Sequence, residues 1–220
     1  GIGLESASSS NQIGKIPPGE GNTIAYNLGA GVAIYAQSDL TQSGVRNSVR
    51  GNSIHDNNSV GIDLGERGHL DPDLDFDVLG PTPNDSAGHA GPNNYQVFPV
   101  LAPATRNGNT VILHGSITAA PHSEYSIDLF ANRYASLTGY GEGEIYLTTV
   151  TVHTNASGVA TFNVSQPGLS TEYTAFTATA TDADGNTSEF SQVPTSVTLN
   201  STTTLDSSAN PATYGDTVTF

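Results

Sequence analysis

Three tetrapeptides share the order Gly, apolar, variable, apolar: Gly1-Ile2-Gly3-Leu4, Gly31-Val32-Ala33-Ile34 and Gly61-Ile62-Asp63-Leu64. They begin 30 residues apart, and Asn22-Thr-Ile24-Ala-Tyr-Asn27 recurs at the same offset as Asn52-Ser-Ile54-His-Asp-Asn57. Alternate residues of a strand point to opposite faces, so the apolar positions of the three copies can point inward together. One such unit cannot bury its own apolar face, whereas stacked copies build a continuous core. The repeat therefore predicts parallel strands stacked at a 30-residue offset, with Ile2, Val32 and Ile62 in one interior column.

The asparagines of the repeat carry a second expectation. Asn27 and Asn57 suit tight turns, and we expect their amides to stack in a ladder between neighbouring coils. No stretch shows a sustained apolar period of 3.6 residues, which argues against a helical repeat.

These residues resemble a known family. Asn11-Gln-Ile13-Gly14, followed by Gly19-Glu-Gly21-Asn22-Thr-Ile24, is similar to the coil signature of bacterial right-handed parallel β-helix repeat proteins, and Val45–Asn57 is similar to the coil that follows. The resemblance covers residues 1–66 and implies that residues 1–68 form coils of such a helix. Proteins of this family include polysaccharide lyases and epimerases as well as adhesins and surface stalks, so the resemblance implies a fold more than an activity.

Composition excludes several classes of protein. The 220 residues contain 6 Lys and Arg against 21 Asp and Glu, a formal charge of −15, and no Cys. Nucleic-acid binding needs clustered basic residues, and disulfide scaffolds, thiol nucleophiles and Cys-ligated metals need cysteine. No apolar run reaches the length of a membrane-spanning segment, so we expect no direct membrane insertion.

Residues 69–95 form an acidic junction rich in Pro and Gly. Asp71, Asp73, Asp75 and Asp77 occupy every second position, which in an extended chain places all four carboxylates on one face. Two interpretations stay open: a Ca²⁺ site, since this ion prefers oxygen ligands, or a solvated acidic strand that caps the coils. The spacing is not that of an EF-hand, because Phe76 stands where the loop needs glycine. The segment Gly91–Leu101 again resembles bacterial β-helix proteins, although His89 and Ala90 replace acidic residues usual in that family.

Residues 96–194 alternate like strands between turns. We expect strands at 110–117, 125–130, 145–153, 159–164 and 173–180, with turns at Asn107-Gly108-Asn109, Ser157-Gly158 and Asp184-Gly185-Asn186. This number of short strands suits an immunoglobulin-like sandwich without a disulfide. The segment Thr177–Ser191 resembles the last hairpin of bacterial Ig-like repeats, and residues 195–220 resemble a linker and the truncated start of a second repeat.

Catalytic signals are sparse. Arg46 and Arg50 are the weak catalytic candidates, because a β-helix lyase uses a basic side chain beside a substrate carboxylate, but both can equally serve a turn or face solvent. The six histidines are scattered without metal-ligand spacing. Asp182-Ala-Asp184-Gly-Asn186 can either chelate Ca²⁺ or simply make its turn.

The fold class expected overall is all-β: C-terminal coils of a right-handed parallel β-helix joined to an immunoglobulin-like β-sandwich. Gly1 begins directly inside an apolar pattern, so we expect a piece of a longer polypeptide. The leading hypothesis is a non-catalytic structural or adhesion segment of a large bacterial protein, secreted or at the cell surface. It would need no cofactor apart from the calcium just considered, and its partners would be surface carbohydrate or another protein. The alternative is part of a polysaccharide-acting β-helix enzyme whose catalytic coils lie mostly upstream.

Overall fold

The computed structural model describes residues 1–5, 7–17, 19–36, 44–66, 81–85, 90–194, 198–199, 207–208, 213–215 and 217. Within these ranges the protein is all-β, and its single helix is a 3-10 turn, Pro92–Tyr95. The all-β class expected from the sequence is therefore confirmed for the described part. The acidic run Asp71–Asp77 lies outside it, so the structure does not test the calcium prediction.

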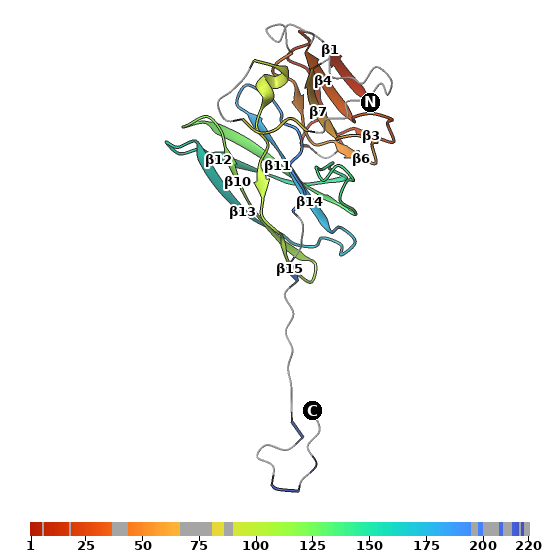
Figure 1. The fold of residues 1–220 in the computed structure, drawn as a ribbon, viewed down its shortest axis with the longest axis vertical. Helices are drawn as coiled ribbons and strands as arrows, with labels where there is room; N and C mark the ends of the chain where they lie inside the picture. Colours follow the sequence, from red (N-terminus) through yellow and green to blue (C-terminus); the bar gives the residue numbers. More distant parts are fainter. Residues whose placement is uncertain are drawn as a thin grey trace.

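The described residues between 1 and 66 form what we call the parallel stack, in which three columns of short strands pair in parallel (Figure 1). The columns are β1 (Ile2–Glu5), β4 (Val32–Ala36) and β7 (Ile62–Glu66); β2 (Gln12–Ile13) and β5 (Ser48–Val49); and β3 (Thr23–Ala25) and β6 (Ser53–His55).

The register of the first column follows the sequence repeat. Ile2 pairs with Val32 and Val32 with Ile62, and both Val32 and Ile62 are buried. The predicted interior column is thus confirmed. One pairing departs from the 30-residue offset, because Asn11 and Asn47, beside β2 and β5, are 36 residues apart. The connection from β4 to β5 is longer than that from β1 to β2, and the β5–β6 connection is correspondingly shorter, so Asn22 and Asn52 return to an offset of 30.

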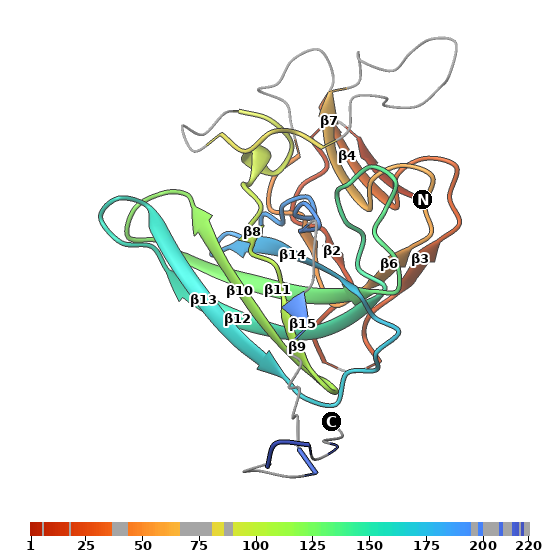
Figure 2. The same ribbon diagram turned by 60° about the horizontal axis from the view of Figure 1, so that its bottom comes forward.

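The remaining strands form what we call the two-sheet unit (Figure 2). One sheet has the order β13-β10-β9-β15 with β8 also paired to β10, and the other has the order β12-β11-β14. All pairs are antiparallel except β15 with β9. The strands are β8 (Val100–Leu101), β9 (Thr105–Asn107), β10 (Thr110–Thr118), β11 (Glu124–Asn132), β12 (Ile145–His153), β13 (Val159–Gln166), β14 (Ala175–Asp182) and β15 (Thr198–Leu199). The five strands expected from the sequence are present, with ends shifted by at most two residues.

Strand β11 is buried on both faces, which explains how the two parts of the molecule join. Ile127 and Leu129 point into the core between the two sheets. Phe130, on the opposite face, instead joins the apolar cluster of the parallel stack. Asp128, on that same face, is also fully buried. The sheet β12-β11-β14 therefore separates two cores, and its outer face packs on the stack.

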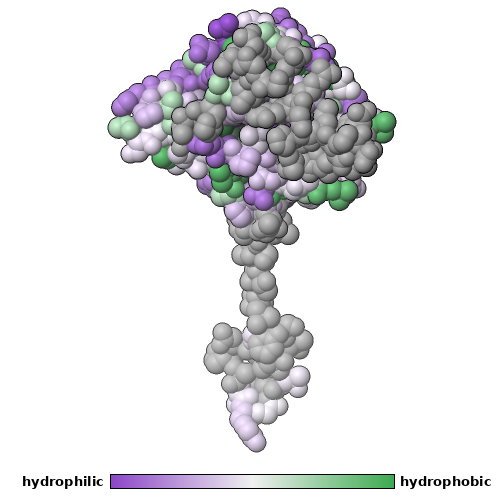
Figure 3. Space-filling view, turned by 45° about the horizontal axis from the view of Figure 1, so that its top comes forward, coloured by the Kyte–Doolittle hydropathy of each residue, from purple (hydrophilic) through white to green (hydrophobic). Residues whose placement is uncertain are grey.

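The coloured surface in Figure 3 is mixed, with hydrophilic residues prominent and hydrophobic residues in small separate patches. None of the helical segments within the described ranges is long and apolar enough to cross a membrane.

Candidate functional site

The last coil of the parallel stack ends against the two-sheet unit. A terminal strand exposes backbone N–H groups along its edge, and proteins cover such edges to prevent pairing with other chains. Here each of the three terminal strands, β5, β6 and β7, donates a backbone N–H to the two-sheet unit. The donors and acceptors are Val49 N to Thr187 Oγ1 (3.0 Å), Ile54 N to Gly143 O (2.8 Å) and Leu64 N to Glu189 Oε1 (2.8 Å).

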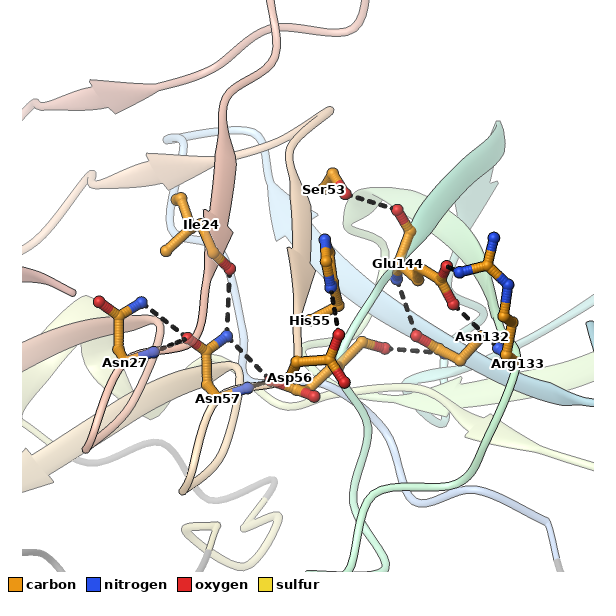
Figure 4. A network of polar contacts seen from close by, with 10 residues as sticks. Ile24, Asn27, Ser53, His55, Asp56, Asn57, Asn132, Arg133 and Glu144 are labelled. Carbon is orange, nitrogen blue, oxygen red and sulfur yellow. Dashed lines mark hydrogen bonds and ion pairs between the residues drawn. The ribbon is translucent and has the colours of Figure 1, made fainter.

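One asparagine ladder of the stack, in which Asn27 meets Asn57 (Figure 4), continues onto Glu142 of the two-sheet unit. Asn57 Oδ1 accepts hydrogen bonds from both the backbone N and the Nδ2 of Asn27, at 3.2 and 2.7 Å, which confirms the ladder expected from the sequence. Glu142 Oε1 accepts from the same two nitrogens of Asn57, both at 2.9 Å. Glu142 therefore takes the place that the asparagine of a further coil would occupy.

A second ladder ends in the same way. Asn47 Oδ1 accepts from the backbone N and Nδ2 of Asn11, at 3.1 and 2.8 Å. Asn93 Oδ1 then accepts from the backbone N of Asn47 at 3.0 Å, while Asn93 Nδ2 donates to the carbonyls of Asn47 and Thr187. Because Asn93 is completely buried, the bonds that Asn93 makes are shielded from water.

Aromatic side chains fill the space between the two parts. Phe130 and Phe190 meet edge to face, with ring centroids 5.2 Å apart, inside the apolar cluster of the stack. The rings approach glycines on both sides of the boundary: a Cβ on Gly143 would lie 2.6 Å from Phe130, and a Cβ on Gly61 would lie 2.8 Å from Phe190. Only a residue without a side chain lets these backbones come so close.

Glu189 is another deeply buried carboxylate of this boundary. Only 2% of its surface is exposed, its Oε1 accepts from Leu64 N and its Oε2 accepts from Thr82 N at 2.7 Å. Burial raises the pKa of Glu189 well above its ordinary value, the nearby Asp63 carboxylate raises it further, and the two backbone donors oppose the shift. Glu189 therefore links three chain segments: β7, residues 81–85, and the segment after β14 to which Glu189 itself belongs.

Arg50, the first of the two weak catalytic candidates, lies at the same boundary with its side chain largely buried, and a catalytic role for it stays a prediction. Its Nε and Nη2 donate to the two carboxylate oxygens of Asp128, at 2.8 and 2.7 Å. The hydrogen bond with Asp128 raises the pKa of the guanidinium, against the effect of burial. Thr149 Oγ1 also donates to Asp128, at 2.5 Å, and in turn contacts the Tyr146 hydroxyl. Every oxygen of the buried carboxylate is thus engaged in holding the stack to β11.

Arg46, the other candidate, occupies a turn. Its backbone has a φ of 59°, its N–H donates to Asn186 Oδ1 at 2.6 Å, and its Nε donates to Ser10 Oγ at 3.3 Å. The structure therefore places both arginines at the boundary with the two-sheet unit, where Arg46 contacts Asn186 and Arg50 contacts Asp128.

The Asp182–Asn186 segment makes its own turn. Asp182 Oδ1 accepts from the backbone N of Asp184 and of Asn186, and Asp182 Oδ2 accepts from Asn186 Nδ2. Its oxygens therefore serve the turn, one of the two readings that the sequence left open. Across the part of the chain that the structure describes, no three His, Asp or Glu side chains are placed to hold a metal ion. The calcium candidates Asp71, Asp73, Asp75 and Asp77 are outside that part.

A groove of about 610 Å³ runs beside the Asn57–Glu142 contact, between the turns of the stack and the connection from β11 to β12. Tyr26 and Leu28 line it from the stack, and Tyr134 and Leu137 from the connection. Asp56, Glu142 and Glu144 add carboxylates to the lining. Burial raises the pKa of Glu142, while the two hydrogen bonds from Asn57 oppose the shift. Glu144 also forms an ion pair with Arg133, in which Nη1 and Oε1 lie 2.5 Å apart (Figure 4).

Sequence reasoning missed Asn93, Glu142 and Glu189, because each is a single residue far along the chain from the strand it meets. One signal was present for Glu142: it is flanked by Gly141 and Gly143. Glycine on both sides of a polar side chain is typical of a backbone that approaches another segment closely.

No protein-family model matches the chain, and a comparison with curated proteins finds no match either.

Proposed function

We propose that this chain is a non-catalytic structural segment of a secreted or cell-surface protein, in which the two-sheet unit caps the end of the parallel stack. The observation that carries the proposal is the supply of one hydrogen-bond acceptor to each terminal strand, through Thr187, Gly143 and Glu189. Stacked repeats need terminal caps with a different outer face to stay soluble. A capping unit would be expected to accept the last hydrogen bonds of the asparagine ladders, as Glu142 and Asn93 do.

The finer fold assignment belongs to the same proposal. The parallel stack is the C-terminal end of a right-handed parallel β-helix, and the two-sheet unit is an immunoglobulin-like sandwich. Parallel pairing at a repeated offset supports the first part, and two sheets around one core support the second. Its role is mechanical and adhesive: a stiff segment that presents a lateral surface to carbohydrate or to another protein. The net charge of −15 disfavours self-association.

Scanning calorimetry of the whole chain tests the capping role. One cooperative unfolding transition is expected, because the stack and the two-sheet unit share a core through Phe130 and Phe190. Phe190→Ala should lower the midpoint of that single transition, whereas Tyr214→Ala, which removes a fully exposed ring, should leave it unchanged. Two transitions, with only one moved by Phe190→Ala, would contradict the proposal.

The absence of catalysis is tested separately. Incubation with pectin, alginate and related polymers should release no new chain ends. Turnover that disappears in Arg46→Ala or Arg50→Ala would replace this proposal with the enzyme alternative.

A further inference from the structure

The groove beside Glu142 combines features that no capping role requires. Six large apolar side chains are strongly exposed within the described residues, and four of them line this one groove: Tyr26, Leu28, Tyr134 and Leu137. Concentrated exposed apolar surface on a soluble protein marks a binding site. The volume of about 610 Å³ also falls within the range of small-molecule sites.

Tyr26 is held outward by a backbone conformation that costs stability. Its φ is 60°, in the left-handed region that favours glycine and asparagine. The turn requires this conformation, because Asp56, which occupies the equivalent position in the next coil, has a φ of 53°. It does not demand tyrosine, whose ring is 78% exposed and touches His55 only edge to face. A strained aromatic at an exposed position points to a use for the ring.

The polar lining limits the chemistry of the ligand. Asp56, Glu142 and Glu144 contribute carboxylates, and Asn58, Ser136 and Thr138 contribute amide and hydroxyl groups. Among the described residues, no Lys or Arg lines the groove. Carboxylates accept strong hydrogen bonds from hydroxyl groups and repel other anions. The faces of the two tyrosine rings attract the weakly positive axial C–H groups on the face of a sugar ring.

We infer that this groove binds a chain of neutral sugar units, with Tyr26 and Tyr134 stacking on sugar faces and the carboxylates accepting sugar hydroxyls. The inference rests on the adhesive part of the proposed function and supplies its ligand class and site. The groove shares Glu142 with the cap, but sugar binding is measured by titration and capping by unfolding, so the failure of one can be told from the failure of the other.

Isothermal titration calorimetry on the full chain tests the inference with four oligosaccharide probes and one peptide. The probes are cellohexaose and N-acetylchitohexaose (neutral), a chitosan hexamer (cationic), hexagalacturonate (anionic) and a lysine-rich hexapeptide. At least one neutral probe should give a saturable isotherm and bind more tightly than the charged probes and the peptide. Tyr26→Asn and Tyr134→Ala should each weaken that binding about tenfold or more, since an aromatic anchor is removed. Tyr214→Ala, an exposed tyrosine outside the groove, should not change it.

Tyr26→Asn separates binding from folding, because asparagine suits the left-handed turn and should leave the melting temperature equal or higher. Absence of binding by both neutral probes would overturn the inference, as would tighter binding of the chitosan hexamer, hexagalacturonate or the peptide. Wild-type affinity in both Tyr26→Asn and Tyr134→Ala would overturn it as well. None of these binding results changes the outcome expected from scanning calorimetry, which tests the capping role.

Discussion

At the scale of single residues, most ladder turns of the parallel stack share one requirement. The residue before the asparagine adopts a positive φ at Ser10, Tyr26, Arg46, Gly51 and Asp56, whereas Gly21, before Asn22, does not. Only one of these is glycine, so the others accept a conformational cost that the stacked asparagines offset. This explains why Arg46, which from sequence resembled a catalytic candidate, lies in a turn with its backbone N–H bound to Asn186.

The Arg50–Asp128 pair gives the first prediction at this scale. Asp128 is fully buried, so removing its partner leaves an uncompensated charge. Arg50→Met should reduce the free energy of unfolding by about 3 kcal/mol, measured by urea denaturation. Arg133→Met, which breaks an exposed pair, is the matched control and should have little effect. Equal losses in the two variants would show that the buried pair does not hold the boundary.

Glu189 predicts the pH dependence of stability. Its pKa is raised in the folded protein, so the folded state favours the protonated carboxyl. The contribution of Glu189 to stability is therefore complete below its ordinary pKa of 4.5 and is lost as the pH rises through the raised value. Urea denaturation from pH 4 to pH 8 should show this decline in wild type and a flatter profile in Glu189→Gln. An unchanged slope in the variant would assign the pH dependence to other groups, such as Glu142.

At the scale of elements, sequence periodicity predicted the strands and their pairing in the stack, but it did not predict the contacts between the two parts of the molecule. The 30-residue offset predicted the pairing of Ile2, Val32 and Ile62 because each coil presents the same apolar pattern to its neighbour. Alternation likewise predicted the strands of the two-sheet unit. It could not reveal that the second face of β11 is buried, because Asp128 and Phe130 meet residues from a segment some 80 positions earlier in the chain. Such contacts depend on the local fit and charge of individual side chains, and no repeated spacing in the sequence indicates them.

The ladder that runs from Asn27 to Glu142 supports a prediction for Asn57. Its side chain bonds to Asn27, to the Ile24 carbonyl and to Glu142, so removal leaves several partly buried groups without partners. Asn57→Ala should cost about 2 kcal/mol of unfolding free energy, measured by urea denaturation. The neighbouring Asn58 is exposed, and Asn58→Ala should be close to neutral. A similar loss in both variants would argue that the turn, not the ladder, is what the asparagine stabilises.

The acidic run Asp71–Asp77 carries the calcium prediction. If the four carboxylates bind Ca²⁺, adding the ion should raise the melting temperature, because a ligand that binds only the folded state stabilises it. Scanning calorimetry with calcium and with a chelator measures the effect, and Asp73→Asn combined with Asp75→Asn should abolish it. An identical midpoint in both conditions would leave the solvated acidic strand as the explanation.

At the scale of the whole molecule, two β parts of different pairing geometry are in direct contact. Sequence predicted them as separate domains joined through residues 69–95, and those boundaries stay a prediction. The contacts between the parts are direct: a shared apolar cluster, a buried ion pair and the ends of two asparagine ladders. The parallel stack is therefore covered along its terminal edge by β11, β12, Asn93 and the segments that follow β11 and β14.

Native-state hydrogen exchange at the amides of Val49, Ile54 and Leu64 tests the capping claim most directly. Each amide belongs to a terminal strand and donates to the two-sheet unit. The account predicts that all three exchange with the same free energy as Ile127, deep in the core of that unit, because they open only when the whole molecule unfolds. Exchange of the three amides at the rate of exposed residues, while Ile127 stays protected, would show that the two-sheet unit does not cap the stack.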